Sequence, residues 1–372
     1  GGCVARETYT PICRHVDCVQ DPRRHNIRHT LGDMLMIALC AVVAGADGWT
    51  QVAEYGRSKK EWFKEFLELP NGIPSHDTFG RLFARLDPEQ MREFFRRWLD
   101  DLLDSLVGKT VGIDGKTLCG SDDSTNGAGP IHMVSAWVTD FEIVLGQIET
   151  EAKSNEIKAI PELVKTLALK GAVVTIDAMG CQKKIADEIV KAEADYVIQV
   201  KENQPNLHED IQLFFQDPEN GPFEFHETVD GEHGRVETRK YYLSSDIDWL
   251  PGKESWNGLQ SVAMVVRERE TEKGASVEKS YYIASLEANA SLAAKHIRGH
   301  WGIENGLNWR LDVGFREDHC RVRKGSGPVN FAILRHIALN LLKKEKSLKG
   351  GIQTKRLKAA WDDAYLLKVL GV

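Results

Sequence analysis

The chain has 372 residues, 42% of them apolar and 28% charged, which is ordinary for a globular protein with room for two or three domains. No apolar run is long enough to cross a bilayer and the start shows no signal-peptide pattern, so we expect neither a membrane protein nor a secreted one. The net charge of −7, taken alone, argues against a protein that binds nucleic acid.

The average charge conceals a strong asymmetry along the chain. Residues 294–358 contain fifteen Lys or Arg against five Asp or Glu, so this segment carries a net charge of +10 and the remainder −17. A basic segment on an acidic protein is typical of a DNA-contacting surface. Its candidate contact residues are Arg298, Arg310, Arg316, Arg321, Arg323 and Lys324. The lysines between 343 and 349 are explained as well by a solvated helical face.

The seven cysteines form no paired framework, and the simplest interpretation is reduced thiols in a cytoplasmic protein. A zinc knuckle near the start is the alternative, but no second CxxC or HxxxH pattern completes a familiar site. Its ligands would be Cys3, Cys13, His15 and Cys18. Because the chain begins with Gly1 rather than methionine, its natural N-terminus is left open.

The first part of the chain is predicted to be helical. Residues 1–28 are expected to be loosely structured, and residues 29–107 to form a helical domain. Apolar side chains recur at helical spacing from 31 to 42, and amphipathic helices are predicted over 49–66 and 88–106.

A short turn and a capped helix follow within this domain. The sequence Pro70-Asn71-Gly72 ends one helix, and Ser75 is placed to cap the next through its hydroxyl. Together with Arg81 and Arg85 this hairpin resembles a DNA-binding helix-turn-helix. Such hairpins occur in helical domains of every kind, so this pattern alone does not indicate DNA binding.

After Gly108 the pattern changes to strands alternating with helices. The predicted strands are 110–114, 132–139, 142–149, 172–176 and 195–200, and the predicted helices are 157–169 and 182–192. Nearly continuous apolar runs in strands between helices predict an α/β fold, with a mixed sheet covered on both faces.

Residues 202–285 interrupt this alternation and are predicted to be a β-rich insertion. The chain then returns to the sheet through residues 286–345, which contain a helix from about 291 and another over 330–344. A basic, helical tail is expected over 346–372.

Three acidic residues stand in positions suited to a shared metal site. Asp114 and Asp177 each follow an apolar strand, where ligand sites of α/β sheets form, although each could instead cap a turn. Glu304 lies on a largely apolar helical stripe, so we expect a buried carboxylate with a cation, His300 or a nearby arginine as partner. Three such carboxylates suffice to hold two Mg²⁺ ions for phosphodiester chemistry.

Several motifs occur together and in a fixed order. They are IDGKTLCGS (113–121), EAKSNEIKAIPEL (151–163), TIDAMGCQ (175–182), YVIQVKENQP (196–205), GEHGRVETR (231–239) and HWGIENGLNWRLDVGFRED (300–318). With GADGWTQVAEYG and NGIPSHDTFGRL in the helical part, they resemble bacterial insertion-sequence DDE transposases of the H-repeat-associated group. The resemblance runs from about residue 21 to the C-terminus.

The resemblance implies a ribonuclease-H-like catalytic domain, formed by 108–201 and 286–345, with the insertion before the helix of the final acid. It places Asp114, Asp177 and Glu304 as catalytic residues and ligands of Mg²⁺, with Mn²⁺ as a possible substitute. The implied activity is cleavage of double-stranded DNA at transposon ends and strand transfer into target DNA, by a homodimer on DNA. Such a protein would work in the bacterial cytoplasm, bound to the nucleoid and to no membrane.

Further basic side chains are candidates for DNA contact. Lys116 and Lys201 follow strands near the expected site, where they would hold the scissile backbone or remain ordinary surface lysines. Arg235 and Arg239 project from one face of a strand, so they would contact phosphates or form a cross-strand ion-pair ladder. His300 is included because it stands where related transposases often have arginine.

The chain also departs from the family pattern. Cys119 stands where such sequences usually carry Arg, and Asn308 where they usually carry His. Ile297, His300 and Leu311 occupy the places of a frequent Tyr, Arg and Lys. Three interpretations therefore stay open: an active transposase, a ribonuclease-H-like nuclease without strand transfer, and an inactive DNA-binding remnant.

Overall fold

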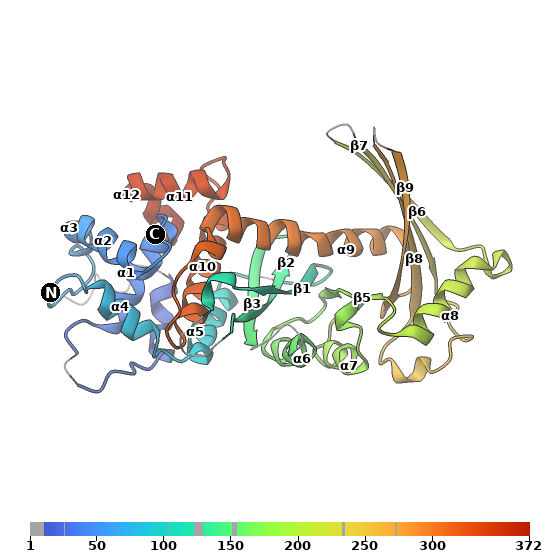
Figure 1. Cartoon of the computed structure of the whole chain (residues 1–372), viewed down its shortest axis with the longest axis horizontal. Coiled ribbons are helices and arrows are strands. Elements are labelled where there is room, and N and C mark those ends of the chain that lie inside the picture. Colours follow the sequence, from blue (N-terminus) through green and yellow to red (C-terminus); the bar gives the residue numbers. More distant parts are fainter. Residues whose placement is uncertain are drawn as a thin grey trace.

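The computed structural model describes residues 11–25, 27–103, 105–122, 129–150, 155–232, 235–271 and 274–372. The molecule is elongated, with three parts along its long axis (Figure 1). N-terminal helices lie at one end, a mixed sheet in the middle, and a set of long antiparallel strands at the other end.

The N-terminal helices are η1 (Pro11–Cys18), α1 (Leu31–Val43), α2 (Trp49–Ser58), α3 (Lys60–Phe63), α4 (His76–Phe83) and α5 (Pro88–Asp100). Ser75 caps α4 by accepting a hydrogen bond from the Thr78 N–H, as its position in the sequence predicts. The 3-10 helix η1 lies within the segment expected to be loosely structured, because Ile12 is buried in the helical core. The single helix predicted over 49–66 is divided at Lys59 into α2 and α3.

The central sheet is formed by β1 (Thr110–Thr117), β2 (His132–Val138), β3 (Ile143–Thr150), β4 (Val173–Ile176) and β5 (Asp195–Val200). β1, β2 and β3 pair antiparallel, whereas β4 pairs parallel with both β1 and β5. An antiparallel three-stranded meander extended by two parallel strands is the ribonuclease-H-like arrangement that the resemblance implies. The predicted fold class is therefore confirmed.

Helices cover both faces of this sheet (Figure 1). α6 (Glu156–Thr166) and α7 (Lys183–Lys191) pack on one face through an apolar core shared with the strands. α9 (Ala290–Gly302) runs along the other face, and α10 (Gly327–Lys344) connects the sheet to the N-terminal helices. The chain ends in α11 (Ile352–Trp361) and α12 (Asp363–Leu370).

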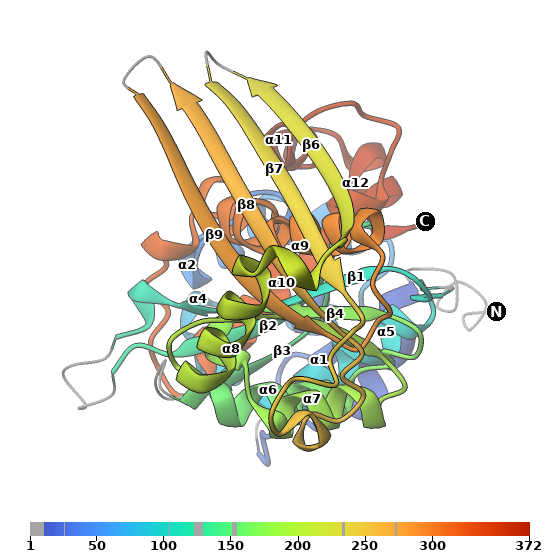
Figure 2. The same cartoon turned by 90° about the vertical axis from the view of Figure 1, so that its right-hand side faces the viewer.

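The insertion contains α8 (Pro205–Gln216), β6 (Glu224–Glu232), β7 (Arg235–Ser244), β8 (Ser261–Thr271) and β9 (Gly274–Ala284). Its four strands are antiparallel neighbours and project beyond the rest of the molecule (Figure 2). β9 pairs with β5, so the insertion continues the central sheet into one sheet of nine strands. Among the described residues, no helix combines the length and apolar character needed to span a bilayer.

Candidate active site

Asp114 and Asp177 come from neighbouring parallel strands. The register pairs Ile113 of β1 with Ile176 of β4, so the next residue of each strand is an aspartate at the same level of the sheet. The sequence predicts that β1 ends at Asp114, but β1 continues to Thr117 because β2 pairs with it along its whole length. Asp114 therefore lies within β1, partly buried, beside the point where β4 ends at Ile176.

Glu304 reaches the site from the end of α9, in a π-helical segment over Ile303–Asn308 (η8). Close approach of α9 to β1 requires Gly299, because a Cβ there would lie 2.9 Å from the Thr110 Cγ2. The expectation that Glu304 is buried is wrong: its neighbour Ile303 is fully buried, whereas Glu304 is exposed to the pocket described below. The burial expected from α-helical spacing is wrong because the chain is wound as a π-helix over Ile303–Asn308.

The three carboxylates interact electrostatically. The pKa of Asp114 is raised from 3.8 to about 6, mainly by burial and also by the negative charges of Asp177, Glu304 and Glu156, while a backbone hydrogen bond from Gly115 opposes the change. Asp177 also caps the following 3-10 turn, since its Oδ1 accepts hydrogen bonds from the backbone N–H of Met179 and of Gly180. No three His, Cys, Asp or Glu side chains in the described part of the chain are close enough to hold a metal ion as they stand. The charges of the three acids therefore affect one another, although their side chains are not placed to hold one metal ion in this structure.

A buried histidine–glutamate pair lies beside Asp114. His132 Nε2 is bonded to Glu156 Oε1, and His132 Nδ1 lies 3.0 Å from the Thr117 Oγ1. The pair fills the space that a side chain at position 115 would need, so Gly115 is required there. Neither His132 nor Glu156 is among the site residues predicted from the sequence; the signal for Glu156 was a glutamate in the EAKSNEI motif together with the glycine after Asp114.

His300 lies between the acids and the sheet. Its Nδ1 is 3.1 Å from the Thr175 Oγ1 in β4. Burial lowers its pKa, and the opposing effects of Asp177 and Glu304 do not cancel that change. We therefore describe it as a neutral imidazole that fixes the end of α9 against the strand.

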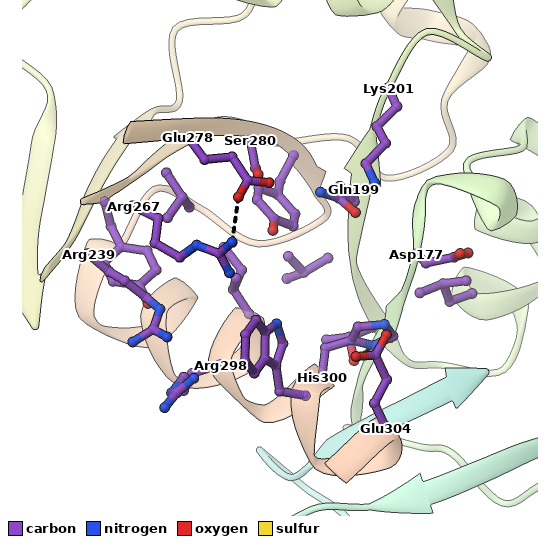
Figure 3. A pocket seen from close by; sticks show the side chains of 18 residues that line it. Asp177, Gln199, Lys201, Arg239, Arg267, Glu278, Ser280, Arg298, His300 and Glu304 are labelled. Atoms are coloured by element: carbon purple, nitrogen blue, oxygen red, sulfur yellow. Dashed lines mark hydrogen bonds and ion pairs between the residues drawn. The ribbon is translucent and has the colours of Figure 1, made fainter. Parts of the chain in front are cut away.

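A pocket of about 300 Å³ opens between α9 and the inner face of the insertion strands. In Figure 3, Asp177, His300 and Glu304 lie at one end of this pocket and three arginine side chains gather toward the other. The guanidinium groups of these arginines lie 5.3–5.7 Å from the centre of the Trp301 indole, within the range of cation–π contact. They are Arg239 of β7, Arg267 of β8 and Arg298 of α9.

Carboxylates hold each of these arginines in place. Arg239 is bonded to Glu237 and to Asp230, and Arg298 lies 3.2 Å from the same Asp230. Arg267 lies 2.5 Å from Glu278, the ion pair drawn in Figure 3. Arg267 and Trp301 were missed by sequence reasoning, because nothing in one sequence brings β8 beside α9.

Comparison with known proteins places the chain in a family. Residues 111–341 match the family model described as "Transposase DDE domain", and residues 13–99 match the one described as "DDE_Tnp_1-associated". The chain belongs to the DDE transposase domain family. The predicted resemblance is thereby confirmed.

Relatives of this transposase-family chain are similar over almost their full length. The H repeat-associated putative transposase YhhI of Escherichia coli K12 is 38% identical, over 96% of this chain and 97% of that protein. The putative transposase YncI of E. coli O157:H7 is 39% identical, over 96% and 93%. A solved piggyBac transposase synaptic complex with hairpin DNA aligns with a TM-score of 0.43 and 13% identity, covering all of this chain and 84% of that one.

The two departures from the family pattern take different places in this DDE domain. Asn308 faces the site, where its Nδ2 donates a 3.4 Å hydrogen bond to Asp114 Oδ2. Cys119 is an exposed residue outside the pocket, at the start of the 3-10 helix η2 (Cys119–Ser121). The predicted zinc knuckle has no support in the described residues, and Cys3 lies outside them.

The other basic residues predicted to contact DNA occupy several different surroundings. Lys201 is exposed and lines the pocket, whereas the Arg235 side chain lies outside the described residues. Lys116 is bonded to Asp312 and lies 3.0 Å from Glu317, so these partners hold it away from solvent. Arg310 is bonded to Glu142 and lies over Trp137. The remaining four line a separate groove: Arg316, Arg321, Arg323 and Lys324.

Proposed function

We propose that this chain is a transposase that cleaves DNA at the ends of an insertion sequence and transfers the cut strands into target DNA. The observation that carries the proposal is the placement of Asp114 and Asp177 at one level of adjacent strands, with Asp177 and Glu304 lining one pocket and both acting on the charge of Asp114. Membership of the DDE transposase domain family supports the same assignment.

The three acids fit a divalent ion. They offer only carboxylate oxygens, the ligands that Mg²⁺ and Mn²⁺ prefer, and the pKa of Asp114 is raised by burial and by the neighbouring carboxylates, with no offsetting cation beside it among the described residues. We propose that Asp114, Asp177 and Glu304 hold such ions and move closer together when they do. When bound, divalent ions at such a site activate a water or a 3′-hydroxyl and stabilise the leaving oxygen.

The chain's own residues would bind and orient the DNA. Three arginines gather around Trp301, which lies about one helical turn before Glu304. Their positive charges are suited to the phosphates on either side of the scissile bond. Lys201 stands on the opposite rim. Neutral His300 keeps Glu304 in position without adding a charge that would compete for the acids.

Two ends of one element must be cut and joined, so we propose that the chain acts as a homodimer on double-stranded DNA. A bacterial cytoplasmic location, at the nucleoid when DNA is bound, belongs to the same proposal. Lys116, Arg310 and Arg235 remain predicted DNA contacts. For Lys116 and Arg310, contact with DNA requires that the carboxylates that now hold them give way.

Two other functions are distinguished by the products of one reaction. Purified full-length chain is incubated with Mg²⁺ or Mn²⁺, a supercoiled plasmid and labelled duplexes carrying the sequences that flank its own coding region. A transposase joins labelled ends to the plasmid, a nuclease only nicks the duplex, and an inactive remnant binds the ends without cutting. The remnant is the second candidate because Asn308, in place of the family's usual histidine, contacts Asp114 directly.

Matched variants identify the residues responsible. Glu304→Gln is expected to lower cleavage at least ~1,000-fold, because a ligand that carries negative charge is lost. Glu278→Gln removes a carboxylate of the same pocket that pairs with Arg267 instead of facing the acids, and should retain cleavage within about tenfold. Equal cleavage by Glu304→Gln and the unmodified chain would overturn the assignment of the acids.

A further inference from the structure

A second basic surface lies apart from the acids, in a groove of about 1,010 Å³ between the N-terminal helices and the segment that precedes α10. One wall is formed by the start of α2 and by α4, and the other by residues 316–324. Five arginine or lysine side chains line it against two aspartates. The five are Arg81, Arg316, Arg321, Arg323 and Lys324.

The groove's cations are available to a ligand. Within the described part of the chain, only Arg316 of the five comes within ion-pair distance of a carboxylate, 3.8 Å from Asp47. Asp47 itself is largely buried, and burial raises its pKa. The second aspartate, Asp77, is exposed and lies 3.5 Å from His76. The positive charge of the groove is therefore only weakly offset.

Buried side chains and a hydrogen bond hold the backbone of the 316–324 segment in place, so its basic side chains start from a fixed position. Residues alternate along it: Cys320 and Val322 are buried, whereas Arg321 and Arg323 face outward. The Cys320 Sγ donates to the Asp47 carbonyl, which anchors the segment to the N-terminal helices. Such an arrangement lowers the conformational entropy lost when a ligand binds.

The opposite wall of the groove adds backbone N–H groups, which also attract an anion. α2 begins at Trp49 with Gly48 at its N-cap, and no side chain caps it there. Gly48 and the first residues of α2 line the groove, so backbone N–H groups of the first turn are directed toward the same space as the cations. Exposed Arg81 of α4 completes this wall.

We propose that this groove binds the sugar–phosphate backbone of double-stranded DNA, outside the segment that reaches the acids. The inference rests on the proposed function for the choice of DNA, because charge complementarity alone specifies only a polyanion. It adds a second contact region, built jointly by the N-terminal helices and the catalytic domain, that holds the duplex independently of cleavage.

The test measures binding of a fluorescent 30-base-pair duplex by anisotropy, in EDTA, at 50 to 200 mM salt. Combining Arg321→Gln, Arg323→Gln and Lys324→Gln removes three groove cations. The control combines Lys344→Gln, Lys346→Gln and Lys349→Gln, three exposed lysines at the end of α10 and just after it that make no ion pair within the described residues. Both variants change the net charge equally, and thermal denaturation checks that both are folded.

Loss of three phosphate contacts should reduce the slope of log K against log salt by about 2.7, so the fourfold salt increase weakens the variant ~40-fold less than the unmodified chain. The control should keep the original slope. Arg81→Gln, on the other wall, should reduce the slope by about 0.9. An unchanged slope in the groove variant, or equal changes in both triple variants, overturns the inference. This assay contains no metal and does not measure cleavage. Failure of the separate cleavage assay with Mg²⁺ or Mn²⁺ would therefore refute the proposed function and leave the binding result unaffected.

Discussion

Replacing Asp114 by asparagine should stabilise the protein while abolishing cleavage. Burial and the neighbouring carboxylates raise the pKa of Asp114 from 3.8 to about 6 in the folded chain. A difference of about 2 pH units corresponds to ~3 kcal/mol, at 1.36 kcal/mol per unit, as the upper limit of the cost of ionising this group on folding. Asparagine carries no charge and can accept the hydrogen bond that Asn308 donates to Asp114.

The same pKa determines whether the free energy of unfolding rises or falls with pH, and over which pH range it changes. Between about pH 3.8 and 6 the folded chain binds more protons at Asp114 than the unfolded chain, so the free energy of unfolding falls as pH rises through this range. Asp114→Asn should therefore match the unmodified chain near pH 4. Its advantage should grow to at most ~3 kcal/mol above pH 7.

The assay is urea denaturation followed by tryptophan fluorescence, in EDTA, from pH 4 to pH 8. Glu142→Gln is the matched control of opposite sign, because Glu142 is paired with Arg310 and Lys343 and its pKa is lowered although burial opposes this. That variant should be less stable at pH 8. If Asp114→Asn is no more stable than the unmodified chain at pH 8, burial and the neighbouring carboxylates do not destabilise the ionised Asp114, and the proposed electrostatics of the site are refuted.

Three further substitutions test the contacts around the site. Glu156→Leu leaves His132 buried without its partner and should cost about 3 kcal/mol in urea denaturation, whereas an unchanged midpoint would show that the pair contributes nothing. Asn340→Leu removes both side-chain bonds to the backbone of Val144 and should cost about 2 kcal/mol by the same method; a loss under 0.5 kcal/mol would contradict this role. Trp301→Ala removes the ring shared by three guanidinium groups and should weaken binding of end-sequence DNA about tenfold, with Trp301→Phe restoring part of it; equal affinity would exclude the proposed platform.

The adjacent positions of Asp114 and Asp177 follow from local signals in the sequence. Apolar runs ending at Ile113 and Ile176 identify buried strands, and the following aspartates then fall at the edge where parallel strands open. Ser75 was predicted as a cap for the same reason, since a helix start and its capping hydroxyl are neighbours in sequence. Order and type of the central elements follow from such patterns.

Features that depend on contacts between distant segments could not be predicted in this way. The exposure of Glu304 depends on π-helical winding, which has no signature in the spacing of apolar residues. β6, at the outer edge of the sheet, has a largely polar sequence with little strand signal of its own, and pairing with β7 holds it in place. The arginines around Trp301 come from β7, β8 and α9, and only the folded chain brings them together.

The central claim, a shared divalent site at three acids, is tested most directly by counting bound Mn²⁺ by electron paramagnetic resonance in the presence of end-sequence duplex. We expect saturable binding by the unmodified chain and its loss in Asp114→Asn, Asp177→Asn and Glu304→Gln, with Glu278→Gln unaffected. Retention of the same bound Mn²⁺ by any one of the three acid variants would contradict it.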